Sequence, residues 1–348
     1  MSNQKFNVAV VGATGAVGEQ ILKLLDQRDF PISSLKLLSS ARSAGTTINF
    51  KGQDITVEEA TPESFKGIDI ALFSAGGDVS KELAPHAARH GAVCIDNTNA
   101  FRMDPHTPLV VPEVNPEQID EHNGIIANPN CSTIQMVAAL KPLQDAYGIS
   151  RIIVSTYQAV SGAGSRAIDE LHRQTKAVIE GQEVTPDILP VGSLPVKHQI
   201  AFNAIPQIDK FQENGYTLEE MKMVLETKKI MKDESISVTA TCVRIPVVYG
   251  HSESVYVELK NDYDLDAVKK LLADSPGITL VDDPSSQAYP LATDCAGKPD
   301  VFVGRLRRDL GDNKGLNMWI VSDNLMKGAA WNAVQIAEII VSKRNARA

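Results

Sequence analysis

Apolar and polar residues alternate along the first third of the chain in a pattern that predicts strands joined by helices. The segment FNVAVVG reads as a buried strand, and GAVGEQILKLLDQR follows it as a helix with one apolar side. Strands that alternate with helices predict right-handed crossovers and a parallel, doubly wound sheet. Four more apolar runs continue the pattern, at SLKLLSS, DIALFSAGG, AVCIDNT and GIIANPN.

After Cys131 the elements become longer and the alternation changes. The segment STIQMVAALKPLQDAYG predicts a helix, and a second long helix is expected from Arg166 to Glu180. Later strands with alternating polar and apolar residues predict a mixed or antiparallel sheet with one covered face and one free face, which is a frequent dimer-forming surface. They are RIIVSTYQAV, ISVTATCVRIPV, SESVYVELK, DVFVGRLRRD and NMWIVSD, with the helix TLEEMKMVLETKKIMK among them.

The chain's 348 residues suit two domains better than one. We expect a first domain at residues 1–131, joined by a C-terminal helix at about 328–348, and a second at 132–327. The fold class is then α/β, with a Rossmann-like doubly wound N-terminal domain plus an α+β catalytic and dimerisation domain. The stretch from Gly181 to Val196, which contains three prolines, receives no role.

Composition narrows the class of protein. Hydrophobic residues make up 43% and charged residues 22%, as in an ordinary globular protein. The net charge of -9 argues against a nucleic-acid binder or an anionic-membrane binder, because both rely on excess Lys and Arg. Neither a signal peptide nor a membrane span is recognisable. Four widely spaced cysteines without CxxC pairs indicate reduced thiols, so we expect a cytoplasmic protein.

A glycine-rich turn connects the first strand to the first helix. In VAVVGATGAVG, Gly12, Gly15 and Gly18 form a GxxGxxG pattern. Glycine permits a tight turn and lets backbone N–H groups approach a phosphate at the helix N-terminus. The turn could merely link strand to helix, but its position after a strand and before an amphipathic helix favours dinucleotide binding.

The end of the second strand indicates which dinucleotide is bound. An NAD enzyme usually carries an acidic residue there for the ribose hydroxyls, whereas LLSSARSAG contains none and places Arg42 between Ser40 and Ser43. A guanidinium with neighbouring hydroxyls suits a 2′-phosphate. Arg42 could equally be a solvated surface arginine. The pattern favours NADP(H).

Cys131 lies where a strand and a turn become a helix, in GIIANPNCSTIQMVAAL. The unpaired N–H groups of a first helical turn favour the thiolate form of a cysteine there. A buried structural cysteine is the alternative, and it is the reading we give Cys94 and Cys242, which lie within apolar strands. Because Cys131 lies in a polar turn, we interpret it as a nucleophile.

The run NPNCST resembles the aspartate-β-semialdehyde dehydrogenase family. The resemblance is carried further by GATGAVG upstream and by STYQAVSGAG, ATCVRIPV, HSES and SDNLMKGAAWNAVQIAE downstream, so it covers essentially the whole chain. It implies NADPH-dependent reduction of 4-phospho-L-aspartate to aspartate semialdehyde, with release of phosphate. This step lies in the biosynthesis of lysine (through diaminopimelate), threonine and methionine. The resemblance also implies a homodimer.

The resemblance also implies roles for individual positions. Cys131 matches the nucleophile that forms an acyl-thioester, Gln158 the residue that orients substrate, and His251 the acid–base group. For the substrate, Arg244 matches the arginine that binds the carboxylate, Glu219 the residue that contacts the amino group, and Arg102 with Lys222 the phosphate-binding pair. Besides Gly12, the positions that match the cofactor site are Thr14, Gly15, Ala16, Val17, Arg42, Ser43, Ser161, Gly162 and Asn324.

Simpler readings exist for several of these residues taken alone. Arg102 and Arg244 could be surface arginines, and Glu219 with Lys222 a weak ion pair on a helix surface. His86 and His90 have the spacing of metal ligands, but no third ligand is evident, so we expect no metal.

Two other enzyme families and a non-catalytic protein are alternatives to this resemblance. N-acetyl-γ-glutamyl-phosphate reductase shares the cysteine chemistry, but Arg244 with Glu219 favours a free amino acid. The missing second-strand acid disfavours a glyceraldehyde-3-phosphate dehydrogenase. A non-catalytic NADP-binding sensor would be expected to have lost some of these residues.

Overall fold

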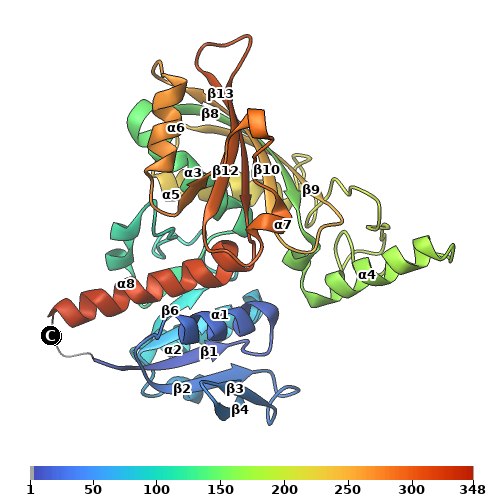
Figure 1. Ribbon diagram of the computed structural model, residues 1–348. Coiled ribbons are helices and arrows are strands. Elements are labelled where there is room, and N and C mark those ends of the chain that lie inside the picture. The colour runs from blue at the N-terminus through green and yellow to red at the C-terminus, as the bar shows by residue number, and fades with distance from the viewer. Residues whose placement is uncertain (1–3, 348) are drawn as a thin grey trace. The chain divides into compact units, whose positions relative to one another are not determined.

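The computed structural model describes residues 4–347, which form two units with a separate sheet in each (Figure 1). The first unit comprises the chain up to Asn130 together with the stretch from Ala329 onward. The second unit runs from Cys131 to Gly328. Both units combine helices with a sheet, so the α/β fold class predicted from the sequence is confirmed.

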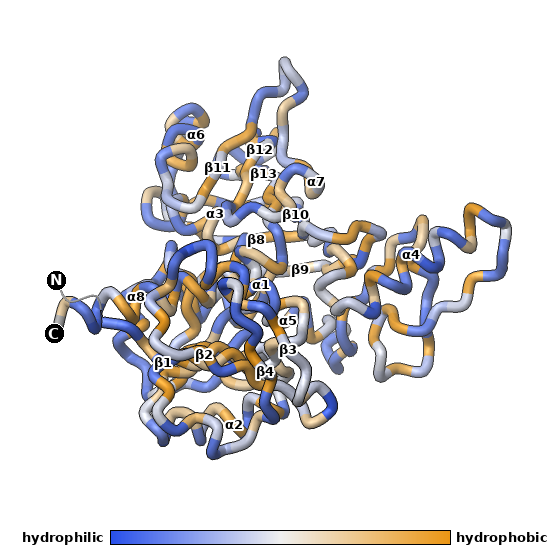
Figure 2. The backbone as a smooth tube through the Cα atoms, turned by 60° about the horizontal axis from the view of Figure 1, so that its bottom comes forward, coloured by the Kyte–Doolittle hydropathy of each residue, from blue (hydrophilic) through white to orange (hydrophobic). Residues whose placement is uncertain are grey.

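The first unit is built on a seven-stranded sheet of order β3-β4-β2-β1-β5-β6-β7. All neighbouring strands are parallel except β3 and β4, which form an antiparallel hairpin at one edge. The strand order reverses at β1, and ligands of such sheets bind at this point, beyond the carboxyl ends of the strands. Figure 2 shows hydrophobic residues along β1 and β2. The strands are β1 Phe6–Val11, β2 Ile32–Ser39, β3 Thr47–Phe50, β4 Gln53–Glu59, β5 Ile70–Phe73, β6 Val93–Asp96 and β7 Ile125–Ala127.

The C-terminal helix packs in the first unit although it follows the second in sequence. Helix α8 contacts α1 and β6. The side chain of Asn332 on α8 donates to the backbone oxygen of Val110 at 3.0 Å and to the side-chain oxygen of Asn128 at 2.7 Å. The helical segments of this part of the chain are α1 Ala16–Gln27, η1 Pro62–Phe65, α2 Gly77–Arg89, η2 Pro116–Glu121, η5 Met326–Ala330 and α8 Trp331–Arg347.

The second unit is built on a six-stranded mixed sheet of order β11-β12-β13-β10-β8-β9. Helices α3, α5 and α6 pack on it, with α5 against β9 and α3 against β10. Burial alternates along β8, and Ile153 on this strand remains 38% exposed. The predicted mixed sheet with one covered and one open face is therefore found. The strands are β8 Ile149–Gln158, β9 Ser237–Arg244, β10 His251–Leu259, β11 Ile278–Leu280, β12 Val301–Arg308 and β13 Gly315–Ser322.

The long helices of the second unit lie where the sequence pattern predicts them. The helix expected from Arg166 to Glu180 is α4, and the helix expected after Cys131 already includes the cysteine as its first residue. Helix α6 and the short elements after it were not predicted. The helical segments are α3 Cys131–Tyr147, η3 Val160–Ala163, α4 Ser165–Ile179, α5 Leu218–Met231, α6 Leu265–Ala273, η4 Pro284–Ser286 and α7 Ala292–Cys295.

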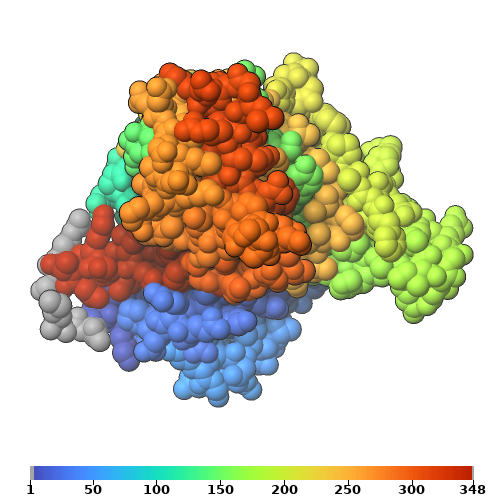
Figure 3. All heavy atoms as spheres, turned by 45° about the horizontal axis from the view of Figure 1, so that its top comes forward, coloured from blue at the N-terminus to red at the C-terminus, as the bar shows by residue number. Residues whose placement is uncertain are grey.

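Helix α4 and the irregular stretch after it form a lobe that projects from the rest of their unit (Figure 3). A small apolar core that includes Leu171, Leu189 and Ile200 holds this lobe together. Beside it, the buried carboxylate of Glu170 accepts hydrogen bonds from three consecutive backbone N–H groups, those of residues 187–189, at 2.7, 3.1 and 3.2 Å. The proline-containing stretch is thus ordered by one acid on α4.

Replacing Glu170 by alanine should destabilise the protein, because the backbone N–H of Leu189 loses its acceptor in a buried place and those of Asp187 and Ile188 lose theirs in partly buried ones. A lost acceptor for a buried donor costs about 1–3 kcal/mol, so we expect the free energy of unfolding to fall by about 3 kcal/mol. Equilibrium unfolding in urea measures this free energy. The control is Glu180→Ala at the exposed end of the same helix, which should change stability by less than about 0.5 kcal/mol. Equal effects of the two variants would show that the Glu170 hydrogen bonds are unimportant.

Candidate active site

The glycine turn after β1 is packed so tightly that side chains are excluded from two of its positions. Gly12 has a φ of +84°, and a Cβ there would lie 2.8 Å from the backbone carbonyl of Ser74. A Cβ at Gly18 would lie 2.2 Å from the backbone oxygen of Gly12. Gly15 precedes the first residue of α1, where the N–H groups of the first turn are free to bind an anion. The turn therefore fits a dinucleotide pyrophosphate.

The end of β2 presents polar side chains beside this turn. Ser39 is the last residue of β2, and its hydroxyl lies 3.0 Å from that of Thr14. Arg42 follows in an exposed turn, and Ser43 is half-buried. An exposed guanidinium at this place can reach a phosphate without first breaking a buried contact.

Cys131 differs from the other cysteines in its exposure. It begins α3 and is partly exposed, whereas Cys94, Cys242 and Cys295 are buried. Burial raises the pKa of all three buried thiols, to about 12 for Cys295. A Cβ at Gly328 would lie 2.8 Å from the Cβ of Cys131, so no side chain fits at position 328 beside Cys131. The sequence had indicated no such role for Gly328.

Three buried side chains of the second unit gather at one end of its sheet. Gln158 and Arg244 end the parallel strands β8 and β9 and are paired in register. His251 begins β10, which runs antiparallel to β8, so that its start lies beside the end of β8. The strand register thus brings together residues that are far apart in the sequence.

The guanidinium of Arg244 is buried and only partly satisfied. Its Nη1 donates to the backbone oxygen of Ala159 at 2.7 Å, while its Nε has no hydrogen-bond partner among the described residues. Burial lowers the pKa of Arg244, and the acidic groups of Glu219 and Cys131 act in the opposite direction. A buried cation with an unused donor suits the carboxylate of a ligand. The effect of Cys131 also indicates that its sulfur lies near this guanidinium.

His251 is held as a neutral imidazole. Its Nδ1 accepts a hydrogen bond from the backbone N–H of Ala159 at 3.0 Å. Burial, followed by the positive charge of Arg244, lowers the pKa of His251 to about 3. The ring hydrogen therefore lies on Nε2, which is buried and has no partner within residues 4–347. A Cβ at Gly162 would lie 3.3 Å from this Nε2 and 3.0 Å from Nη1 of Arg244, so glycine leaves room there.

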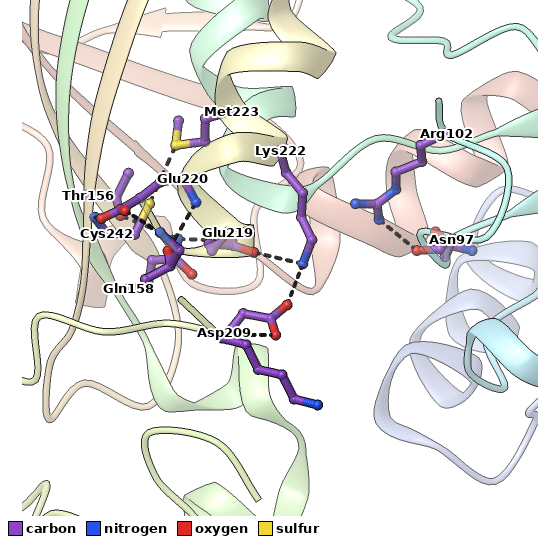
Figure 4. Close-up of polar contacts among 12 residues, drawn as sticks. Asn97, Arg102, Thr156, Gln158, Asp209, Glu219, Glu220, Lys222, Met223 and Cys242 are labelled. Atoms are coloured by element: carbon purple, nitrogen blue, oxygen red, sulfur yellow. Dashed lines mark hydrogen bonds and ion pairs between the residues drawn. The ribbon is translucent and has the colours of Figure 1, made fainter. Parts of the chain in front are cut away.

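A chain of polar contacts leads from Gln158 to the surface (Figure 4). The amide of Gln158 donates to Glu219 at 3.1 Å, and the ammonium of Lys222 lies 3.2 Å from the other oxygen of Glu219. Lys222 also contacts Asp209 at 3.1 Å. Because Glu219 is only 5% exposed, the pair is not the weak surface ion pair considered from the sequence. Nothing in the sequence pattern had pointed to Asp209.

Arg102 belongs to the first unit and is fixed by that unit's backbone. Its Nε donates to the backbone oxygen of Asn128 and its Nη2 to that of Asn97, both at 2.9 Å, and the residue is 7% exposed (Figure 4). It is therefore not a solvated surface arginine. Its guanidinium is held in one orientation, as the binding of a phosphate requires.

The remaining residues matched to the cofactor lie in the second unit, Ser161 and Gly162 in η3 and Asn324 in the loop after β13. Asn324 donates to the hydroxyl of Ser161 at 3.0 Å and accepts from the backbone N–H of Gly250 at 3.0 Å. These bonds join the loop after β13 to the loop after β8. They also hold the residue before His251 in place.

No group of three or more His, Cys, Asp or Glu in residues 4–347 could hold a metal ion. His86 and His90 lie on or just after α2, at least partly exposed. No helix in the described part of the chain is long and apolar enough to cross a membrane.

Two family models match the chain. The model described as semialdehyde dehydrogenase, NAD binding domain, matches residues 7–122, and the model described as semialdehyde dehydrogenase, dimerisation domain, matches residues 140–327. Aspartate-semialdehyde dehydrogenase of Bacillus subtilis is 63% identical over 333 residues, which are 95% of this chain and 96% of that protein. The enzyme of that name from Aquifex aeolicus is 55% identical and covers 97% of this chain and 98% of its own.

Solved structures are similar over nearly the whole chain as well. The structure of aspartate semialdehyde dehydrogenase II from Vibrio cholerae complexed with ASA has a TM-score of 0.92 and 51% identity, covering 97% of this chain and 99% of that one. The structure of the Candida albicans enzyme with NADP has a TM-score of 0.75 and 27% identity, covering 98% and 99%.

Proposed function

The chain belongs to the aspartate-semialdehyde dehydrogenase family, and from that premise we propose that it reduces 4-phospho-L-aspartate to L-aspartate 4-semialdehyde through a thioester on Cys131. The observation that carries the proposal is the buried set of Gln158, Arg244 and His251 at one end of the second sheet. It supplies a hydrogen-bonding amide, an unsatisfied cation and a neutral imidazole in the unit that also contains Cys131.

In the proposed reaction, the thiolate of Cys131 attacks the acyl phosphate and phosphate leaves, giving an aspartyl thioester. NADPH, when bound, would supply the hydride that reduces this thioester. The resulting thiohemiacetal then collapses to the aldehyde and returns the electron pair of the C–S bond to the sulfur of Cys131. In the opposite direction the thiolate adds to the aldehyde, the thiohemiacetal would lose hydride to NADP⁺ to become the thioester, and inorganic phosphate finally cleaves that thioester.

His251 acts on the tetrahedral intermediates of this reaction, as a hydrogen-bond donor and as a proton-transfer group. Its neutral ring presents an N–H at Nε2, which can donate to the oxygen that becomes negative when the thiolate adds. A bound anionic substrate favours the protonated ring, so the same nitrogen can transfer a proton to or from that oxygen. Arg244 lies beside the ring and opposes its protonation until an anion occupies the site.

The polar contacts among Gln158, Glu219 and Lys222 support a free amino acid as the substrate. Arg244 offers its buried Nε to the α-carboxylate, and Glu219 offers a buried negative charge to an ammonium group. An acetylated nitrogen carries no charge, so N-acetyl-glutamyl phosphate would leave Glu219 without that partner. We assign Lys222 and Arg102 to the phosphate as its cations.

We assign binding of the adenosine half and the pyrophosphate of the cofactor to the first unit, with NADP(H) as the cofactor. The glycine turn fits a pyrophosphate, and Arg42 with Ser43 supplies donors for the 2′-phosphate. Ser161, Gly162 and Asn324 are assigned to the nicotinamide half. The division into a cofactor domain at residues 1–131, with a C-terminal helix at about 328–348, and a catalytic domain at 132–327 is part of this proposal.

Arg42→Ala is expected to weaken NADPH binding much more than NADH binding, because only NADPH carries the 2′-phosphate. Loss of one charge-assisted hydrogen bond costs about 1.5–3 kcal/mol, equivalent to roughly a 10- to 100-fold rise in the Kd of NADPH. Fluorescence titration with both cofactors measures this, with exposed Arg89→Ala as control. Equal losses for NADPH and NADH would show that Arg42 does not bind the 2′-phosphate.

A homodimer in the cytoplasm completes the proposal. The open face of the second sheet includes Tyr157 and Trp319, whose rings lie 5.6 Å apart and offer apolar surface to a second copy. The four free cysteines fit a reducing compartment. The product would feed lysine, threonine and methionine biosynthesis.

A direct test of the thioester is intact-mass spectrometry of the protein after incubation with aspartate semialdehyde and NADP⁺ without phosphate. We expect an aspartyl adduct on Cys131 that disappears when phosphate is added. A Cys131 that stays unmodified without phosphate, in a preparation that turns over once phosphate is added, would contradict the proposed mechanism.

A further inference from the structure

A buried carboxyl group on β10 lies next to His251 and has no part in the reaction proposed above. Glu253 is one strand period beyond His251, so the two side chains point to the same face of the sheet. Glu253 is 0% exposed, and neither carboxylate oxygen has a hydrogen-bond partner among the described residues. An ionised carboxylate is strongly disfavoured at such a place because nothing replaces its hydration.

The neighbours of Glu253 offer it no cation. In the sheet it is paired with Thr156 on β8, which is in turn paired with Cys242 on β9. Burial raises the pKa of Glu253 well above its usual range, and the side chain of Gln135 acts in the opposite direction. Gln135 is therefore close to the carboxyl group, although no oxygen of Glu253 meets full hydrogen-bond geometry.

Gln135 connects the helix of the nucleophile to the strand of the histidine. It lies on α3 one helical turn after Cys131, on the same side of the helix. Its Nε2 donates to the backbone oxygen of His251 at 3.3 Å, and its Oε1 is buried and has no partner within residues 4–347. The amide thus has one unused acceptor, close to a carboxyl group that also lacks a partner.

A single hydrogen on the carboxyl group would give Oε1 of Gln135 a donor and one oxygen of Glu253 a partner. We propose that Glu253 is held as a neutral carboxylic acid that donates its O–H to Oε1 of Gln135, and that the pair positions Cys131 relative to His251. The inference rests on the proposed function and assigns Glu253 and Gln135 as positioning residues, which act on the reaction through α3 and β10. A displacement of about 1 Å between reacting groups can cost roughly 100-fold in rate.

The test compares three single variants of the full chain in the oxidation of aspartate semialdehyde with NADP⁺ and phosphate. Glu253→Leu and Gln135→Leu remove the hydrogen bond, whereas Glu253→Gln keeps a neutral donor of the same shape. Glu258→Leu, on the same strand but the opposite face, is the control. Infrared difference spectra of wild type against Glu253→Gln detect the carbonyl stretch of a protonated carboxyl group without relying on activity.

We expect Glu253→Leu and Gln135→Leu each to lower kcat by roughly 10- to 100-fold with little change in the KM for aspartate semialdehyde. The double variant Glu253→Leu/Gln135→Leu should have a kcat no lower than that of the poorer single variant, because each single change already removes the one hydrogen bond that the two residues share. Glu253→Gln should keep kcat within about threefold of wild type and leave the pH profile unchanged, since a neutral donor is retained.

Three results would overturn the proposal: wild-type kcat in Glu253→Leu, loss of activity in a folded Glu253→Gln, or no protonated-carboxyl band in the wild type. If Glu253→Leu fails to fold, Glu253→Gln and the infrared band still decide. A wild-type protein that is inactive on aspartate semialdehyde would contradict the proposed function instead, and the infrared band would still test Glu253.

Discussion

Cys131→Ala is expected to abolish phosphate-dependent oxidation of aspartate semialdehyde, with kcat reduced by roughly 10⁴-fold or more. Without the sulfur no thioester can form, and nothing remains for phosphate to cleave. This side chain is not among the residues that we assign to the cofactor, so binding of NADPH should persist. Stopped-flow measurement of NADPH formation, with a fluorescence titration of the cofactor, tests both parts.

The matched control is Cys295→Ala. This thiol is 1% exposed, and burial raises its pKa to about 12, so it is not a nucleophile at neutral pH. The control should keep kcat near that of the wild type. Activity that survives in a clean Cys131→Ala preparation would contradict the mechanism.

Arg244→Lys is expected to have the second-largest effect, on substrate binding. Lysine keeps the charge but loses the planar fork, and it cannot both bind the backbone oxygen of Ala159 and present a second aligned donor to a carboxylate. Imperfect pairing of a buried charge costs about 3 kcal/mol, so kcat/KM for aspartate semialdehyde should fall by roughly 100-fold.

Arg151→Lys on the neighbouring strand β8 is the control, because that arginine is exposed. Steady-state kinetics with aspartate semialdehyde as the varied substrate distinguishes the two variants. If Arg244→Lys keeps the wild-type kcat/KM, Arg244 does not bind the substrate carboxylate.

Much of the fold is predictable because burial imposes a clear period on long elements. The five parallel strands of the apolar runs and the helices α1, α3, α4 and α5 all follow from this period. The hairpin of β3 and β4 does not, since only Phe50 of β3 is buried. Lys51 and Gly52, with φ of 50° and 78°, form its two-residue turn, and the Lys-Gly pair was the one local indication.

Helix α6 was not predicted because, as in β3, few of its residues are buried. It is nine residues long, and only Val268 and Leu272 are buried. Its one readable feature is Asp264, whose side chain accepts from the backbone N–H of Ala267 and caps the helix. A cap without a long apolar stripe gives no firm prediction from the sequence.

The family resemblance read from the motifs is confirmed by relatives that cover nearly the whole chain. The roles of individual residues stay predictions. For Gln158, Arg244 and His251 the structure adds burial and mutual proximity, which no spacing in the sequence could give because the strand register creates them. The same holds for Asp209 beside Lys222 and for Glu253 beside Gln135, which depend on contacts between distant elements.

The neutral state of His251 also follows from the structure alone. A histidine within a polar sequence segment suggests an exposed group with an ordinary pKa. Full burial, Arg244 and the N–H of Ala159 instead hold it unprotonated in the free protein. Substrate binding therefore has to supply the negative charge that favours its protonated form.

The most direct test of the central claim is a comparison of substrates and cofactors in one assay, with inorganic phosphate present. Aspartate semialdehyde and N-acetyl-glutamate semialdehyde are each oxidised with NADP⁺ or NAD⁺, and reduced cofactor is followed by absorbance. The structure predicts the highest kcat/KM for aspartate semialdehyde with NADP⁺, and little rate when phosphate is omitted. A preference for the acetylated substrate, or a steady rate independent of phosphate, would contradict it.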